Sequence, residues 1–281
     1  MSDAALQSHL QPWLAARPAR LASVPFLRPH DADAARALAA LEQAVLGALA
    51  GVREPSVAEA KLRWWADEMA AVPAGSARHP LTQALASHAA VGRVDAALWG
   101  RPAAAALAAI TVATPVDEAA QWALALAVCA PWAALEAAWW QGPGADSGAA
   151  AQAAALAWLV DDLLRLPDLG ERPRLPLPMQ RLARHGLARD DLAADTPARR
   201  AAVREQCTAL AARAAAIRHV SLPLLRGFDL RLDARALRQA ARRADPLPAL
   251  ARRRGRPGPA AVLAAWRAAR AAGVRAVDPG H

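Results

Sequence analysis

The segment Glu54–Glu68, EPSVAEAKLRWWADE, is the most distinctive part of the chain and sets the interpretation of the rest. Leu62, Trp65 and the following Met69 recur at steps of three and four residues, which places them on one face of an α-helix. Trp64 points about 100° away from its neighbour, so the two rings could also line a wide apolar cavity. The segment therefore predicts a helix with one buried face, and its tryptophans are candidate ligand-binding residues.

The remaining sequence has the same helical character. Runs of β-branched residues are few, and Asn-Gly turns and alternating polarity are missing. Apolar residues recur with helical periodicity in segments bounded by Pro, Gly or capping residues. We therefore predict an all-α fold of roughly eight to ten helices. The clearest helical segments are 34–51, 56–72, 79–98, 102–113, 116–140, 147–166, 197–220, 233–243 and 259–272.

A single domain accounts for this pattern. Helical periodicity continues on both sides of the proline-rich segment 167–178, so we interpret that segment as an internal loop. The sequence shows no repeat period and no long linker. The predicted organisation is an N-terminal extension at 1–19, a helical domain at 20–272 and a C-terminal tail at 273–281.

The composition allows a sizeable core, because 55% of the 281 residues are hydrophobic. Much of that share is alanine, which buries little area per residue. The 10 tryptophans, against 2 Phe and no Tyr, must therefore supply much of the core volume. Cys129 and Cys207 have no spacing typical of a disulfide framework or a thiolate metal site.

The chain is basic, with a formal net charge of +9. Such a balance permits contact with nucleic acid or with an anionic membrane. The densest basic run, ARRRGRP at 251–257, has no interleaved aromatic residue, and no zinc-finger, RNA-recognition or KH signature is present. We predict no nucleic-acid partner, and we expect exterior arginines to favour an anionic membrane surface.

The longest uncharged stretch, Ala119–Leu135, contains Pro131 and is shorter than the roughly 20 residues of a bilayer span. It therefore predicts a buried helix. The N-terminus lacks the basic start and apolar run that are typical of a signal peptide. The predicted location is the cytoplasm, with peripheral contact with the inner membrane left open.

A second segment, LVDDLLRLPDL at 159–169, places Asp161, Asp162 and Asp168 in an apolar run. Grouped carboxylates are typical ligands of Mg²⁺. Arg165 lies within helical reach of the first two carboxylates, and such a pair contributes about 0.2–0.5 kcal/mol when exposed. If the pair is buried, it would neutralise the charge of a metal pocket.

The order of these segments resembles the squalene/phytoene synthase family of head-to-head prenyltransferases. The resemblance spans about 20–220 and is carried by RLASVPFLRP, ARALAALEQ, REPSVAEAKLRWWADE, HPLTQAL, AAALAWLVDDLLRL and RPRLPLPMQRLARHGLARDDL. The pieces REP and KLRWW look like the branch that includes mitochondrial complex I assembly factors. The resemblance implies a helical bundle of the isoprenoid synthase (type I terpenoid synthase) kind.

The resemblance also implies a magnesium site, in which Asp-rich motifs on two helices bind Mg²⁺ and a substrate diphosphate. The positions that match the family's ligand aspartates are not acidic in this chain: they are Leu46, Gly47, Ala50, Arg165 and Leu169. Glu42, one turn before the first motif, is the nearby acid. Degenerate motifs of this kind predict no metal site.

Two functions follow from these observations. We expect a protein that binds a lipid or isoprenoid, or assists assembly with a protein partner at the membrane, without a cofactor. The candidate ligand-binding residues are Trp64, Trp65, Trp158 and Arg165, whose guanidinium could meet a phosphate directly. The alternative is an active, Mg²⁺-dependent squalene- or phytoene-type transferase with an altered diphosphate site. Its candidate carboxylates are Glu42, Asp67, Glu68, Asp161, Asp162 and Asp168.

Overall fold

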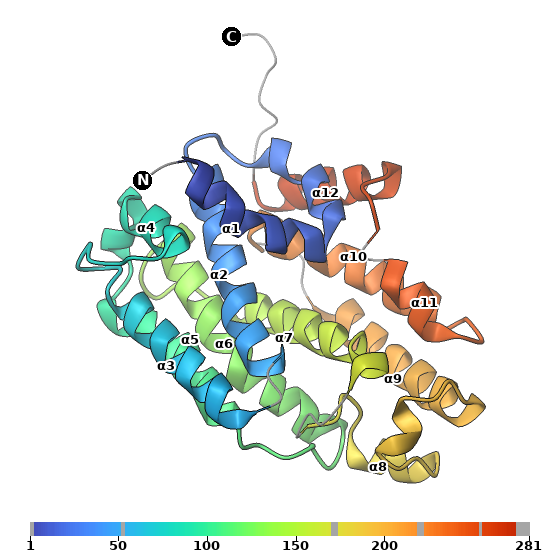
Figure 1. Cartoon of the computed structure of the whole chain (residues 1–281). Helices are drawn as coiled ribbons and strands as arrows, with labels where there is room; N and C mark the ends of the chain where they lie inside the picture. The colour runs from blue at the N-terminus through green and yellow to red at the C-terminus, as the bar shows by residue number, and fades with distance from the viewer. Residues whose placement is uncertain (1–2, 52–53, 170–173, 218–221, 253–254, 274–281) are drawn as a thin grey trace.

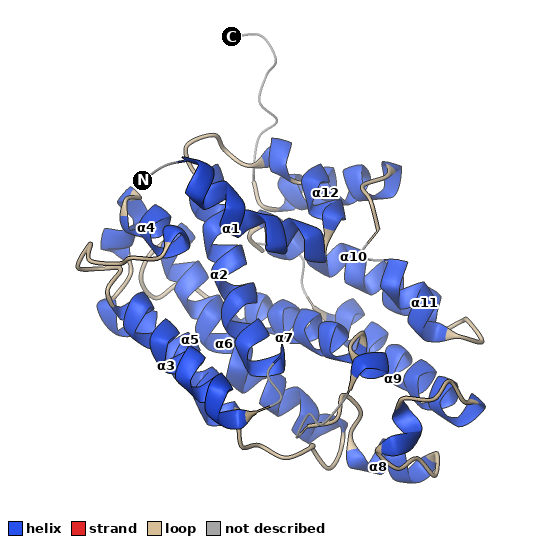
Figure 2. Ribbon diagram, viewed as in Figure 1, coloured by secondary structure: helices blue, strands red, loops and turns tan. Residues whose placement is uncertain are grey.

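The computed structural model describes residues 3–51, 54–169, 174–217, 222–252 and 255–273. All regular structure in these ranges is helical, which confirms the predicted all-α fold (Figure 2). The α-helices are α1 (Asp3–Ala16), α2 (Ala32–Gly51), α3 (Pro55–Ala70), α4 (Pro80–Ala86), α5 (Ala96–Ala109), α6 (Glu118–Gln141), α7 (Gly148–Leu163), α8 (Met179–Arg184), α9 (Pro197–Ala216), α10 (Leu224–Ala240), α11 (Pro246–Ala251) and α12 (Pro259–Ala271). Short 3-10 helices are η1 (Pro18–Ala22), η2 (Val24–Phe26), η3 (Ala89–Arg93), η4 (Leu166–Asp168) and η5 (Asp190–Leu192).

Capping residues explain where the observed helices differ from the predicted ones. The segment 79–98 is divided because His79 and His88 each accept a hydrogen bond from the backbone N–H two residues on, and each begins a new helix. The helix expected at 102–113 begins earlier, because the Asp95 side chain caps α5 at the Ala97 N–H. Apolar periodicity alone does not detect these restarts.

The helix α10 is longer than the predicted segment 233–243, because it begins directly after Pro223. Its first turns carry Arg226, Asp229 and Asp233 at steps of three and four residues, which places three charged side chains on one face. This charge interrupts the apolar pattern on which the prediction depended.

The helix α6 runs through the middle of the bundle and packs on α5 and α7 (Figure 1). One apolar cluster joins it to α7, α9 and α10, and another joins it to α1–α5. By length and composition, α6 is the one described helix that could cross a membrane, but 56% of its apolar window is buried inside the protein. A buried core helix passes the same test, so this burial agrees with the prediction for Ala119–Leu135.

Tryptophan fills much of the core, as the composition predicted. Trp13, Trp99 and Trp132 are at most 1% exposed, and Trp139 is fully buried. The Trp139 ring stacks on His88 with 5.3 Å between centroids and meets Trp99 edge to face at 5.9 Å. Large rings occupy the volume that alanine-rich helices leave between them.

The helix α1 packs against α2 and α4, and it adds Leu6, Leu10 and Trp13 to the core. Residues 3–16 therefore share the core of the helical domain, while the predicted divisions after residues 19 and 272 stay predictions. The end of α1 positions Arg17 beside the helices that form the candidate site.

We expect Trp139→Ala to lower the free energy of unfolding by about 3–5 kcal/mol, because it leaves a large cavity beside His88 and Trp99. Trp64→Ala is the matched control, since this ring is 48% exposed and its loss should cost about 1 kcal/mol or less. Urea denaturation measures both values. Equal losses would contradict the assignment of Trp139 to the core.

Candidate functional site

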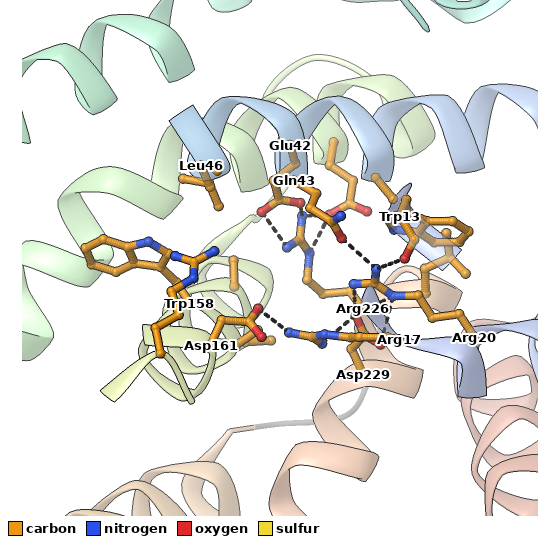
Figure 3. Close-up of a pocket in the computed structure, with 18 residues that line it drawn as sticks. Trp13, Arg17, Arg20, Glu42, Gln43, Leu46, Trp158, Asp161, Arg226 and Asp229 are labelled. Atoms are coloured by element: carbon orange, nitrogen blue, oxygen red, sulfur yellow. Dashed lines mark hydrogen bonds and ion pairs between the residues drawn. The ribbon is translucent and has the colours of Figure 1, made fainter. Parts of the chain in front are cut away.

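A small cavity of about 100 Å³ lies where α2, α6, α7 and α10 meet, and charged side chains converge on it (Figure 3). Its described lining consists of Trp13, Arg17, Arg20, Ala39, Glu42, Gln43, Leu46, Gly47, Glu136, Ala153, Ala154, Ala157, Trp158, Asp161, Arg165, Leu225, Arg226 and Asp229. The lining includes three of the five positions that match the family's ligand aspartates: Leu46 and Gly47 of α2, and Arg165, which follows the end of α7.

Arg226 of α10 joins the carboxylates of two other helices. Its Nη1 and Nη2 donate to the two oxygens of Glu42, each at 2.9 Å, and its Nε donates to Glu136 at 2.8 Å. The three side chains are between 11% and 14% exposed. A guanidinium in this two-pronged geometry fixes its partners in position.

Arg17 makes the corresponding contacts on the other side of the cavity. Its guanidinium lies 2.6 Å from Asp161 of α7, 2.9 Å from Asp229 and 3.7 Å from Asp233, both of α10. The Arg17 side chain is 6% exposed, whereas Asp161 is 32% exposed and lies nearer to solvent. The ion pair between Arg17 and Asp161 joins residues 144 positions apart, which helix spacing could not predict.

Arg20 of η1 connects Asp229 of α10 to α2 and to the end of α1. It donates to Asp229 at 2.8 Å, to the Gln43 side-chain oxygen at 3.1 Å and to the Trp13 carbonyl at 3.1 Å. Its guanidinium also lies 4.7 Å from the centre of the Trp13 ring, within the range of a cation–π contact.

Burial and charge act in opposite directions on the carboxyl groups. Burial raises the pKa of Glu136, although Arg226 opposes the shift. Burial also opposes ionisation of Asp229, but Arg17 and Arg20 outweigh it, so the pKa of that carboxyl is lowered.

Asp233 behaves differently. Burial, together with the neighbouring Asp229 and Asp161, outweighs Arg17 and raises the pKa of Asp233 well above its usual value. The network therefore shifts the two carboxyl groups in opposite directions: it favours the protonated form of Asp233 and the charged form of Asp229.

The structure does not bring all the predicted site residues together. Glu42, Asp161, Trp158 and Arg165 all line the cavity. Asp162 is buried elsewhere, where its charge acts on Arg174. Asp168 on η4 and Asp67 on α3 are exposed.

Glu68 has a structural role. Its Oε1 accepts hydrogen bonds from the backbone N–H groups of Arg78 and His79, each at 2.7 Å, and from the Thr82 hydroxyl at 2.6 Å. These bonds secure the start of α4 against α3. Burial opposes ionisation of Glu68, but the hydrogen bonds outweigh it and lower its pKa.

Trp64 and Trp65 belong to a separate groove between α2 and α3, with a volume of about 680 Å³. It is lined by Ala44, Gly47, Ala48, Ala60, Lys61, Trp64 and Trp65. The two rings meet edge to face with 4.7 Å between centroids. Trp64 is 48% exposed whereas Trp65 is 8% exposed, so one ring lies on the surface and the other beneath it.

Gly47 lines both the groove and the cavity. A side chain built at this glycine would meet no atom within 4 Å, so the space beside it is open. Gly47 is also one of the positions at which the family resemblance expected an aspartate.

Sequence reasoning missed Arg17, Arg20, Arg226, Glu136, Asp229 and Asp233 as site residues. Their contacts join residues up to 209 positions apart, which one sequence does not reveal. The one local signal is the charged face of α10, where Arg226, Asp229 and Asp233 recur at helical spacing. Among the described residues, no three His, Cys, Asp or Glu side chains are grouped to hold a metal ion.

Comparison with solved structures supports the fold. The chain is similar to a dehydrosqualene synthase crystallised in complex with ligand, with a TM-score of 0.61 and 12% identity over 84% of each chain. It is also similar to squalene synthase HpnC from Alicyclobacillus acidocaldarius, with a TM-score of 0.56 and 15% identity over 92% of this chain and 98% of that one. No family profile and no curated protein sequence matches the chain. These likenesses confirm the predicted isoprenoid synthase fold.

We expect Arg226→Met to lower the free energy of unfolding by about 3–5 kcal/mol, because Glu42 and Glu136 would stay buried without their counter-charge. Arg63→Met breaks the exposed pair with Glu59 on α3 and should cost about 0.2–0.5 kcal/mol. Chemical denaturation at pH 7 measures both. Adding Glu42→Gln and Glu136→Gln to Arg226→Met should recover part of the lost stability, because no buried charge is then unpaired. If no stability is recovered, the loss comes from packing and not from charge.

The raised pKa of Asp233 makes stability depend on pH. Above the unfolded pKa of about 3.9, Asp233 binds a proton when the chain folds. The contribution of Asp233 to the free energy of unfolding is therefore complete below that pH. It then falls as pH rises toward the folded pKa, by up to about 1.4 kcal/mol per pH unit. Asp233→Asn removes this dependence and should gain stability over the wild type between pH 4 and pH 7, as measured by chemical denaturation.

Asp229→Asn is the control with the opposite sign. Because the pKa of Asp229 is lowered, its contribution is present at pH 7 and is lost as pH falls through the folded pKa. This variant should be destabilised at pH 7 and approach the wild type in acid. If Asp233→Asn behaves in the same way, Asp233 is charged in the folded chain and the assignment is wrong.

Proposed function

We propose that this protein has the fold of a prenyl-transferring synthase but lacks Mg²⁺-dependent prenyl transfer, and that it acts as a lipid- or isoprenoid-binding or assembly protein. One observation carries the proposal: the cavity carboxylates of α2 and α7 are bonded to arginines. Glu42 accepts two hydrogen bonds from Arg226, and Asp161 pairs with Arg17 at 2.6 Å.

The donor set does not fit a Mg²⁺–diphosphate site. Mg²⁺ requires oxygen ligands in a near-octahedral arrangement at about 2.0–2.1 Å, and at a diphosphate site one or two of these are carboxylate oxygens of the protein. Here the oxygens of Glu42, Glu136 and Asp229 are engaged by guanidinium groups, which cannot coordinate a cation and repel one. A metal ion would have to displace buried arginines whose own charge would then lack a partner.

The two hollows also differ in what they can hold. The cavity of about 100 Å³ has room for a few water molecules, whereas small-molecule pockets are typically about 300–1,000 Å³. The α2–α3 groove, at about 680 Å³, lies in that range and presents Trp64 and Trp65 beside alanines. We therefore assign the apolar chain of the ligand to the groove, with Lys61 positioned for an anionic head group.

The assembly part of the proposal rests on the resemblance of REP and KLRWW to the branch that includes complex I assembly factors. We propose a cytoplasmic protein that meets a protein partner at the inner membrane, without a cofactor or a nucleic-acid partner. The net charge of +9 supports contact with an anionic membrane.

A second candidate is an active transferase of the squalene or phytoene synthase type with an altered diphosphate site. The observation in its favour is that Glu42 of α2 and Asp161 of α7 line one cavity, together with Arg165. Independently of this alternative, the Arg165 guanidinium would meet a phosphate directly in place of a metal ion, so Arg165→Ala should weaken the binding of a prenyl diphosphate. Unchanged binding in this variant would remove that role.

We expect no diphosphate release when the protein is incubated with farnesyl or geranylgeranyl diphosphate and Mg²⁺. We expect farnesol to bind without Mg²⁺, and Trp64→Ser to weaken that binding by about tenfold, because the ring loses its apolar contact with the chain. Met179→Ser on α8 is a matched control, since Met179 and Trp64 are each 48% exposed. Isothermal titration measures binding. Mg²⁺-dependent turnover would overturn the proposal in favour of the transferase.

A further inference from the structure

The helix α12 turns large apolar side chains toward solvent. Val262, Leu263 and Trp266 are 51%, 45% and 42% exposed, and their spacing places them on neighbouring positions of one face. The helix lies at the edge of the bundle beside α10 (Figure 1). On η1, which also packs against α12, Leu21 is 49% exposed. This apolar face has no partner within the described part of the chain.

Alanine, and not these larger residues, attaches α12 to the bundle. Ala261, Ala264, Ala265 and Ala268 form a small core with Phe228 of α10. The inward face therefore supplies the packing that holds the helix. Substitution of the outward residues should leave the fold intact, because exposed positions contribute little to stability.

The segment that contains α12 carries charge of one sign. The segment 246–272 contains six arginines and no Asp or Glu. The Arg270 guanidinium lies 4.9 Å from the centre of the Trp266 ring. Burial lowers the pKa of Arg231 on α10, and the nearby Arg267 charge lowers it further, so cations are close to one another here. Such an arrangement is complementary to an anionic surface.

We propose that α12 docks on an anionic lipid bilayer, with Val262, Leu263 and Trp266 in the interfacial layer and the surrounding arginines against lipid phosphates. Helices that lie in the membrane interface combine Trp and Leu on one side with cations at its border. Arginine stems pack along apolar surface while their charged ends reach the phosphate level. Each arginine near such a surface contributes about 1 kcal/mol of attraction.

Other occupants fit this face less well. A second copy of the chain would bring two arginine-rich segments together, and like charges oppose such a contact. A nucleic acid would pair with the arginines but leave Val262 and Leu263 against water, and the Trp266 face that could stack on a base is covered by Arg270.

The inference deepens the membrane part of the proposed function by naming the partner and the surface that meets it. It rests on α12, whereas the isoprenoid proposal rests on the α2–α3 groove and the central cavity. The two can therefore fail separately.

The test is flotation of the full chain with vesicles, without added isoprenoid. The chain should float with vesicles of phosphatidylglycerol and phosphatidylcholine, and far less with phosphatidylcholine alone. Leu263→Ser combined with Trp266→Ser should weaken binding by at least about tenfold. Arg267→Gln combined with Arg270→Gln should weaken it by about tenfold or more at low salt.

Met179→Ser is the control for exposed apolar area, since Met179 is 48% exposed on α8 and should not affect flotation. Unchanged thermal unfolding of each variant shows that the fold is kept. The proposal is overturned if the wild type binds both vesicle types equally, or if the α12 variants float like the wild type. A wild type that binds no vesicles also overturns it. If the α12 variants then abolish self-association or nucleic-acid binding, the occupant of this face is a second copy of the chain or a nucleic acid.

Discussion

Buried charge must be paired, and this requirement organises the centre of the molecule. Arg226 links α2 and α6 to α10, and Arg17 links the end of α1 to α7 and α10. Arg20 pairs with Asp229 of α10 and also bonds Gln43, and so connects α10 to α2. Because removal of Arg226 would leave Glu42 and Glu136 without their counter-charge in a poorly hydrated place, this pairing holds α2, α6 and α10 in one arrangement. The tryptophan-rich core supplies the apolar packing around it.

The same pairing determines what chemistry the cavity can support. A carboxylate oxygen that accepts a short hydrogen bond from arginine is not free to bind a divalent ion. Under the proposed function, the side chains at the centre of the fold therefore have a structural role. The surfaces that bind other molecules lie on the outside of the bundle. The α2–α3 groove offers apolar volume beside Trp64, and α12 offers an apolar face among arginines. These two surfaces do not share residues, so ligand binding and membrane contact are separate properties.

The sequence predicted the fold class because helical periodicity is local, and residues such as Leu62, Trp65 and Met69 report it directly. It also placed Glu42 and Asp161 on two of the helices that line the cavity. It could not identify Arg226 as the partner of Glu42, which lies 184 residues away, or Arg17 as the partner of Asp161, because such pairs form only in the folded chain. The start of a new helix at a capping residue such as His88 was missed for a local reason. One side chain that bonds the backbone ends a helix, although the apolar pattern continues through it.

The most direct test of the central claim is a titration of Mn²⁺, a paramagnetic substitute for Mg²⁺, followed by electron paramagnetic resonance in the presence of inorganic diphosphate. If Glu42 and Asp161 are held by arginines, the signal of free Mn²⁺ should fall no further with the protein than with diphosphate alone. Stoichiometric loss of that signal, reversed by Glu42→Gln combined with Asp161→Asn, would show that the carboxylates bind metal and would contradict the account.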